Sequence, residues 1–165
     1  MELIENGADY WVTKLGLQPH PEGGYYREVY RSADEVSETK SERKKSAVTS
    51  IYYLLEKSDF SSFHRISSDE IWYFHKGDAL IIHTLENDLQ LNSIELSGDQ
   101  SGVFSHVVKG SKWFSAEMKE KKGFALVSCA VAPGFEFGEF ELAKKDELRS
   151  EFPIHGEIID RLCRL

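Results

Sequence analysis

Several features that would point to a membrane or secreted protein are missing from this chain. No apolar run in its 165 residues approaches the roughly 20 that a membrane-spanning helix needs. The first residues, MELIENGADYW, carry acidic groups where a secretion signal carries positive charge, so no signal peptide is predicted. The two cysteines, Cys129 and Cys163, form no spaced framework. We therefore expect two reduced thiols in a cytoplasmic protein.

Positive charge is also scarce. The chain has 20 Lys and Arg against 28 Asp and Glu, so its formal net charge is -8 at pH 7. Lys and Arg supply most of the affinity of proteins for nucleic acid and for anionic membrane surfaces. We therefore expect neither nucleic acid nor a membrane as a partner. Apolar residues are plentiful, at 41% hydrophobic and 12% aromatic, which is enough for the core of one domain.

The pattern of apolar residues predicts one helix followed by many short strands. Over residues 3–15 apolar side chains recur at three- and four-residue spacing, and Gly16 is a plausible stop. After a first strand from residue 25 to 30, short β-forming runs alternate with turns from residue 47 onward. The predicted strands are 48–55, 62–66, 70–75, 79–85, 89–95, 104–108, 112–117, 124–132 and 135–142. Short strands at such close spacing are typical of a sandwich or a barrel.

Two segments lie outside this pattern. Residues 32–46 are polar and charged without periodicity, which predicts a solvated, mobile hairpin loop. The tail from residue 144 onward has the spacing of a short helix. No linker to a second domain is visible. We therefore predict a single domain over 1–165, with an N-terminal helix in 1–16, a β-barrel in 25–142 and a helical tail in 144–165.

The stretch HRISSDEIWYFHKG, residues 64–77, has the spacing of a metal-binding pair of strands. His64, Glu70 and Gly77 take three places of the first motif of the cupin superfamily. Ile66 stands where that motif has its second His. The glycines of the second motif are also kept, but Trp113 stands at the place of its His. The chain thus resembles the cupin superfamily, whose fold is a small double-stranded β-helix, or jelly-roll barrel.

One branch of this superfamily is matched over nearly the whole chain. The blocks are LGLQPHPEGGYYREVYRS (15–32), SIYYLLEKSDFSSFHRISSDEIWYFHKGDAL (50–80) and VSCAVAPGFEFGEFELA (127–143). They are similar to the HPEGG and PGF signature blocks of a cupin-like family of uncharacterised function. The resemblance implies a mainly β fold with an N-terminal helix and a short C-terminal helix, and it implies a homodimer. It implies little established chemistry.

The substitutions in the two motifs bear on metal binding. A cupin metal site uses three His and one Glu, and neither Ile66 nor Trp113 can give a lone pair to a metal. His64 and Glu70 remain, whereas metal sites usually have at least three protein ligands. We therefore predict no resident metal, and leave open a weakly bound divalent ion on His64 and Glu70. An apolar, aromatic-walled pocket in place of the ion cage suits a small organic ligand.

His64 and Glu70 are also the main candidates for acid–base catalysis. A buried His beside a carboxyl can transfer protons near neutral pH, although the pair can equally be a remnant of an ancestral site. Tyr73 is the third catalytic candidate, but alternation leaves open whether Tyr73 with His75 or Trp72 faces inward. Candidates for ligand contacts are Trp113, His83, His75, Tyr53, Ile66, His20, Glu22 and Tyr25. For most of these, ordinary core packing or turn formation is the alternative.

Three functions remain open on these residues. The first is binding of a small polar metabolite, related to a sugar or a nucleotide sugar, with metal-independent epimerase- or isomerase-type chemistry. Sugar-nucleotide epimerases share a metal-free jelly roll and use a His base with a Tyr acid, so this hypothesis rests on analogy of fold. The alternatives are a non-enzymatic small-ligand-binding protein and a metal-dependent cupin enzyme with an incomplete ligand set.

Overall fold

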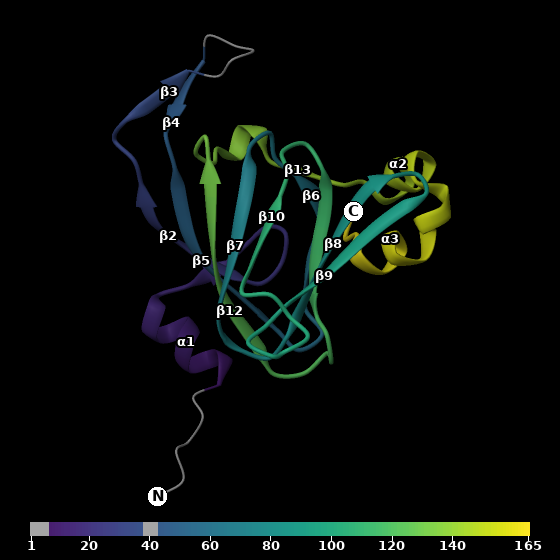
Figure 1. Ribbon diagram of the computed structural model, residues 1–165, viewed down its shortest axis with the longest axis horizontal. Helices are drawn as coiled ribbons and strands as arrows, with labels where there is room; N and C mark the ends of the chain where they lie inside the picture. The colour runs from purple at the N-terminus through teal and green to yellow at the C-terminus, as the bar shows by residue number, and fades with distance from the viewer. Residues whose placement is uncertain (1–6, 38–42) are drawn as a thin grey trace, which may run out of the picture.

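The computed structural model describes residues 7–37 and 43–165, and two β-sheets form its main body (Figure 1). The first sheet contains β1 (Gln18–Pro19), β2 (Tyr25–Arg31), β5 (Thr49–Glu56), β7 (Asp69–Gly77), β10 (Ser105–Val108) and β12 (Phe124–Ala132). The second contains β6 (Phe60–Arg65), β8 (Leu80–Asn87), β9 (Gln90–Leu96), β11 (Trp113–Met118) and β13 (Glu141–Leu142). The strand orders are β1-β2-β5-β12-β7-β10 and β13-β6-β11-β8-β9. The chain is thus the mainly β jelly roll that the resemblance implied.

The main core lies between the two sheets. Side chains alternate along each strand, so every second residue faces this core. On β11, Phe114, Ala116 and Met118 face inward, whereas Trp113 packs in a separate cluster on the outer side. Within β7 the buried residues are Glu70 and Trp72, while Tyr73 between its neighbours is 42% exposed. Glu70 and Trp72 therefore face the interior of the barrel, and Tyr73 faces outward.

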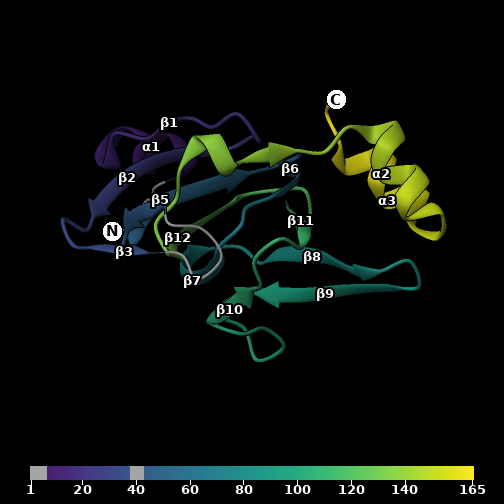
Figure 2. The same cartoon turned by 90° about the horizontal axis from the view of Figure 1, so that it is seen from above.

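Helices cover the outer faces of the barrel. Helix α1 (Ala8–Leu15) packs on Leu54 and Leu126 of the first sheet and ends at Gly16, whose φ is 61°. The part of the predicted helix before residue 7 lies outside the described residues. Helices α2 (Lys145–Glu151) and α3 (Gly156–Leu162), with η2 (Pro153–His155) between them, pack on the second sheet. Figure 2 shows α2 and α3 together at the side opposite α1. No helix among the described residues is long and apolar enough to span a membrane.

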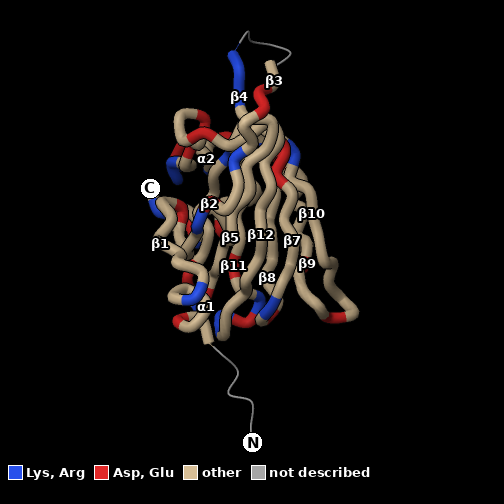
Figure 3. The backbone as a smooth tube through the Cα atoms, turned by 90° about the vertical axis from the view of Figure 1, so that its left-hand side faces the viewer, with Lys and Arg blue, Asp and Glu red and all other residues tan. Residues whose placement is uncertain are grey.

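The structure of the segment 32–46 differs from the predicted loop. Its described arms pair as β3 (Glu35–Ser37) and β4 (Lys44–Ser46), which extend beyond one end of the barrel (Figure 3). Residues 38–42 lie outside the described part of the chain. The prediction that this segment is solvated is wrong at Lys45, whose side chain is fully buried against Ser68 and Glu139. A charged side chain is buried here because it finds a carboxylate.

The predicted strand over 135–142 is also wrong. Residues Phe137–Glu139 form the 3₁₀ turn η1, and only β13 (Glu141–Leu142) pairs with β6. In a regular strand Phe135 and Phe137 would share one face and Phe140 would lie on the other. Instead Phe135, Phe137 and Phe140 pack against one another, with ring centroids 4.9 to 6.2 Å apart. We call residues 135–140 the aromatic roof, because these three rings line the cavity described next.

Candidate functional site

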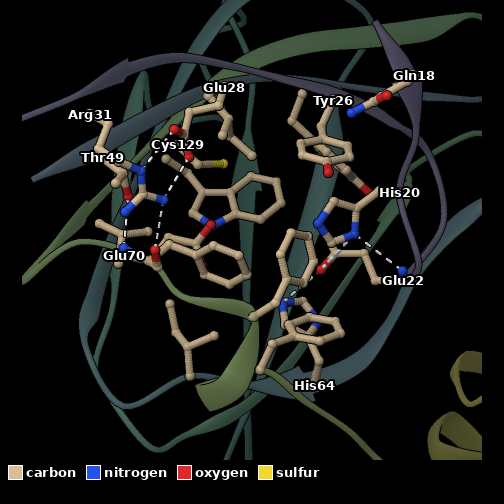
Figure 4. A pocket seen from close by; sticks show the side chains of 18 residues that line it. Gln18, His20, Glu22, Tyr26, Glu28, Arg31, Thr49, His64, Glu70 and Cys129 are labelled. Carbon is tan, nitrogen blue, oxygen red and sulfur yellow. Dashed lines mark hydrogen bonds and ion pairs between the residues drawn. The ribbon is translucent and has the colours of Figure 1, made fainter. Parts of the chain in front are cut away.

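A cavity of about 170 Å³ lies at the end of the barrel beneath the aromatic roof (Figure 4). Its walls come from β1, β2, β5, β6, β7 and β12 and from the segments that follow β1 and β12. The lining residues are Gln18, His20, Glu22, Tyr26, Glu28, Arg31, Thr49, Ile51, Tyr53, His64, Ile66, Glu70, Trp72, Cys129, Val131, Phe135, Phe137 and Phe140. Figure 4 shows His20, Glu22 and His64 at one side, with Arg31, Thr49 and Glu70 at the other.

The HPEGG loop brings Glu22 into the cavity. Gly23 and Gly24 both have positive φ, at 114° and 70°. A Cβ on Gly23 would lie 2.0 Å from the Phe60 carbonyl oxygen, so only glycine fits this close approach. The Tyr53 hydroxyl donates to the Gly23 carbonyl at 2.8 Å, and the Gly24 N–H donates to Asp59 at 2.8 Å. The loop thus both shapes the turn and supplies cavity groups.

Glu22 and His64 are in direct contact inside the barrel. The Glu22 Oε2 atom lies 3.1 Å from His64 Nε2, and the Ser61 hydroxyl donates to Glu22 Oε1 at 2.9 Å. On its other side, His64 Nδ1 lies 2.7 Å from the Ser62 carbonyl oxygen. A carbonyl only accepts hydrogen bonds, so Nδ1 carries a proton. In a neutral imidazole Nε2 then carries a lone pair and no proton. The proton between Nε2 and Oε2 therefore belongs to Glu22.

Burial favours this uncharged arrangement of the pair. It lowers the pKa of His64 to about 4 and raises the pKa of Glu22 above its usual range. His20, the Ser61 and Tyr53 hydroxyls and Arg164 oppose the rise of the Glu22 pKa. Both shifts favour the uncharged form of the pair, in which the Glu22 carboxyl donates its proton to His64 Nε2. Uptake of a proton converts this uncharged pair into a carboxylic acid and an imidazolium, whose buried positive charge needs a negative charge nearby.

His20 lies next to this pair in an aromatic cage. Its ring packs edge-on against Tyr26 at 4.5 Å between centroids, and it stacks on Phe137 at 6.1 Å with 29° between the ring planes. The Glu22 backbone N–H donates to His20 Nδ1 at 3.2 Å, so in the neutral ring Nε2 carries the proton. Burial lowers the pKa of His20, and the nearby Glu22 carboxyl opposes this shift. His20 therefore adds a neutral imidazole to this side of the cavity.

Glu70 is a second buried carboxyl in the same cavity. Burial and the nearby Glu22 carboxyl raise the pKa of Glu70 to about 8, and the Cys129 thiol lies within its hydrogen-bonding reach. Glu70 is therefore protonated at pH 7 and can donate a hydrogen bond or a proton. Burial also raises the pKa of Cys129 well above its usual range, so its thiol is not a thiolate nucleophile.

Arg31 stands at the rim of the cavity. It forms two hydrogen bonds with the Glu28 carboxylate, at 3.0 and 2.9 Å, and a third with the Phe135 carbonyl oxygen at 3.0 Å. Thr49 binds the N–H of the same Phe135 at 2.8 Å. These contacts attach the aromatic roof to β2 and β5. Because Glu28 neutralises Arg31, the rim presents a hydrogen-bonding surface with little net charge.

The fold implies a metal site that these residues do not fit. Among the described residues, no group of three or more His, Cys, Asp and Glu is arranged to hold a metal ion. Ile66 lines the cavity at the place of the second motif His, and both nitrogens of His64 contact Ser62 and Glu22. The Phe114 ring, 4.2 Å from that of His64, fills further space inside the barrel. The donor set thus differs from three His and one Glu.

Six of the residues predicted from the sequence line this cavity. They are His64, Glu70, Tyr53, Ile66, His20 and Glu22. The spacing of the motif on β6 and β7 brought His64 and Glu70 to the same barrel interior. Inside the barrel Glu70 contacts Cys129. A role of these residues in binding or catalysis remains a prediction.

Five predicted residues lie outside the cavity, mostly because their side chains face the other side of a strand. Tyr73 and His75 are on the outer face of β7, where His75 bonds Ser128. Tyr25 packs in the α1 cluster, and Trp113 packs beneath the C-terminal helices under the Arg65 guanidinium. His83 faces outward on β8 and bonds Ser93 and Glu117, at 2.8 and 3.0 Å. The structure therefore corrects their expected placement in the barrel cavity.

Other lining residues were missed, although an alternation signal was present. On β5, Thr49, Ile51 and Tyr53 follow each other at every second position. On β2, Tyr26 and Glu28 do the same, and a register shift between Glu28 and Tyr30 then turns Arg31 inward. The bulge leaves no clear mark in the sequence. The aromatic roof was misassigned as a strand, so its role over the cavity was missed as well.

The barrel and its cavity have the architecture of a cupin. A model of the cupin superfamily (DUF985) matches residues 9–143, and the chain belongs to this family. A search of curated proteins finds no match.

Two solved structures resemble the chain over almost its entire length. A crystal structure of a protein from Shewanella oneidensis is 34% identical, with a TM-score of 0.88 and coverage of 96% of this chain and 98% of that chain. A hypothetical protein from Leishmania major is 31% identical, with a TM-score of 0.89 and coverage of 96% and 99%. Oxalate decarboxylase from Bacillus subtilis is 15% identical at a TM-score of 0.54, covering 87% of this chain and 36% of that chain, which is a likeness of fold alone.

Proposed function

We propose that the chain binds a small polar metabolite, with a sugar or the sugar part of a nucleotide sugar as the main candidate, and moves a carbon-bound proton on it without a metal. The observation that carries this proposal is the buried Glu22–His64 pair, with 3.1 Å between Oε2 and Nε2, in the wall of a cavity. Isomerases and epimerases need a base of this kind next to a carbon acid.

The shape and lining of the cavity support a ligand of about monosaccharide size. The volume of about 170 Å³ is below the range of cavities for drug-sized ligands, which begins at roughly 300 Å³. Trp72 and the aromatic roof offer flat apolar surfaces for the C–H face of a sugar ring, while the two sides of the cavity offer hydrogen-bonding groups. A nucleotide would have to remain outside, near Arg31 at the rim.

The reaction is balanced by two buried acid–base groups. The proton on the carbon next to a carbonyl passes to the Glu22–His64 pair, which then holds a carboxylic acid and an imidazolium. Glu70, whose pKa is raised to about 8, gives its proton to the carbonyl oxygen and becomes a carboxylate. The product of this step is an enediol. Return of a proton to the neighbouring carbon gives isomerisation. Return of a proton to the opposite face of the original carbon gives epimerisation.

The test is deuterium incorporation from ²H₂O into aldoses, ketoses and nucleotide sugars, followed by proton NMR. The wild-type protein should exchange at least one substrate, and chelator treatment should leave the rate unchanged. His64→Gln should reduce exchange by roughly 10²- to 10⁴-fold, which is the usual contribution of a general base. His75→Gln, on the outer face of β7, is the matched control and should exchange as the wild type does. Exchange that requires an added metal would instead support the metal-dependent alternative.

A second candidate function is binding without catalysis. Both nitrogens of His64 are already engaged, by Ser62 and Glu22, so a base function requires Glu22 to accept the carbon-bound proton while it passes its own proton to Nε2. This observation favours a protein that only holds its ligand. Saturable binding of a sugar in the cavity, with no exchange on any substrate of the panel, would establish this function in place of the first.

The proposal includes a cytoplasmic location, expected from the two thiols, and a homodimer, which the resemblance implies. The buried, unpaired Cys129 and Cys163 support a reducing compartment. Sedimentation velocity at several concentrations tests the assembly: a mass of about 38 kDa, twice the 18.9 kDa of one chain, is expected. A single species of 18.9 kDa would contradict the dimer.

A further inference from the structure

Arg164 contacts the HPEGG loop, although the two lie far apart in the sequence. The Arg164 Nε atom donates to the Glu22 carbonyl oxygen at 3.2 Å, and Nη2 donates to the Phe60 carbonyl oxygen at 2.6 Å. The guanidinium also stacks on the Phe60 ring, 3.9 Å from its centroid. Arg164 thus links the backbone of Glu22 to that of Phe60, the first residue of β6.

Ser62 links Leu162 and Arg164 to both members of the buried pair. Its N–H donates to the Glu22 carbonyl at 2.8 Å, and its carbonyl accepts from His64 Nδ1 at 2.7 Å. Its hydroxyl accepts from the Arg164 N–H at 3.2 Å and donates to the Leu162 carbonyl at 3.3 Å. The Ser62 carbonyl fixes the proton on His64 Nδ1, and the Ser62 side chain is bound to Leu162 and Arg164.

A second set of contacts closes around Asp59. Arg164 Nη2 lies 2.6 Å from Asp59 Oδ1, while Asp59 Oδ2 accepts from the Gly24 N–H at 2.8 Å. A Cβ on Gly23 would lie 2.4 Å from Arg164 Nη2, so the glycine leaves room for the guanidinium as well as for the Phe60 carbonyl. Two independent features, the ion pair and this glycine, therefore place Arg164 against the loop.

We propose that Arg164 is a positioning residue that holds the Glu22 carboxyl against His64 Nε2. Arg164 reaches the backbone of Glu22, the partner of Gly24 and the start of β6 at once, which suits the planar fork of a guanidinium. Without it, the loop can move away from β6, and Oε2 leaves the position 3.1 Å from Nε2. The effect on catalysis rests on the proposed function, but the effect on the His64 proton does not.

The primary readout is the ¹⁵N NMR spectrum of the His64 ring, which reports its tautomer and its titration without any substrate. In the wild type His64 should be a single Nδ1–H tautomer that does not titrate between pH 6 and 8, since burial lowers its pKa to about 4. In Arg164→Ala we expect a changed Nε2 shift and a mixture of tautomers. Arg164→Lys keeps the charge but loses the fork, and should lie between the two. A wild-type His64 spectrum in a folded Arg164→Ala protein would overturn the proposal.

Activity and a control variant separate this role from general stability. Where exchange is detected, kcat should fall at least tenfold in Arg164→Ala, with KM within about twofold, because Arg164 does not line the cavity. Arg149→Ala removes an exposed ion pair with Asp160 elsewhere in the tail and should leave the His64 spectrum unchanged. If Arg164→Ala does not fold, Arg164→Lys decides: a wild-type spectrum there counts against positioning. A shifted spectrum with no exchange in the wild type would refute the proposed function and leave the positioning role standing.

Discussion

At the scale of the residue, the buried carboxyl of Glu70 links the cavity to stability. Its pKa is near the usual value of 4.5 in the unfolded chain and about 8 in the folded protein, mainly because burial penalises the carboxylate. Between these pH values the folded state binds more protons than the unfolded state. Stability from this group is therefore fully present below pH 4.5 and is lost as the pH rises toward 8.

Glu70→Gln should remove this dependence while keeping the shape of the side chain. Its free energy of unfolding should exceed that of the wild type by an amount that grows with pH, at up to about 1.4 kcal/mol per pH unit between pH 5 and 8. Urea unfolding at several pH values measures the difference. Glu120→Gln, in an exposed turn, is the control and should follow the wild type. Parallel curves for Glu70→Gln and the wild type would show that Glu70 ionises normally in the fold.

The sequence predicted which strands carry site residues better than it predicted which face of the strand each side chain occupies. His64, Glu70 and Ile66 were placed in the barrel because motif spacing transfers directly. Trp113 was placed there too, but its neighbour Phe114 faces the interior instead. A shift of one residue moves a strand side chain to the opposite face. Only the pairing of β11 with β6 and β8 decides this, and pairing between distant strands cannot be derived from one sequence.

At the scale of the element, the hairpin and the roof show where local patterns fail. Alternation and turn residues predicted the barrel strands from β5 to β12, to within a few residues at their ends. The segment FEFGEF also looks like a strand, yet it forms the roof because long-range groups bind it. Arg43 pairs with Glu136 and Glu139, and Arg31 bonds the Phe135 carbonyl. These partners lie about 90 to 105 residues away, beyond the reach of propensity.

At the scale of the whole molecule, the barrel and the C-terminal helices share strands. The inner core contains Phe114 of β11, and the outer cluster contains Trp113 of the same strand together with Phe63 of β6. His64 follows Phe63 and faces the opposite cluster. The helical tail could be predicted from its periodicity, but this packing on the back of the site could not. Because one strand contributes to both clusters, we expect the two to unfold together.

Ile159→Ala, in the outer cluster, tests whether the two clusters unfold together. Ile159 is fully buried in the outer cluster, and its truncation should lower the free energy of unfolding by about 2–5 kcal/mol. Circular dichroism and tryptophan fluorescence should still report one coincident transition, because Trp72 and Trp113 lie in the two coupled clusters. Ile154→Ala, 63% exposed in the same tail, should change stability by no more than about 0.5 kcal/mol. Loss of helical signal before the fluorescence transition would mean that the tail unfolds on its own and that Arg164 could leave the Glu22 loop while the barrel stays folded.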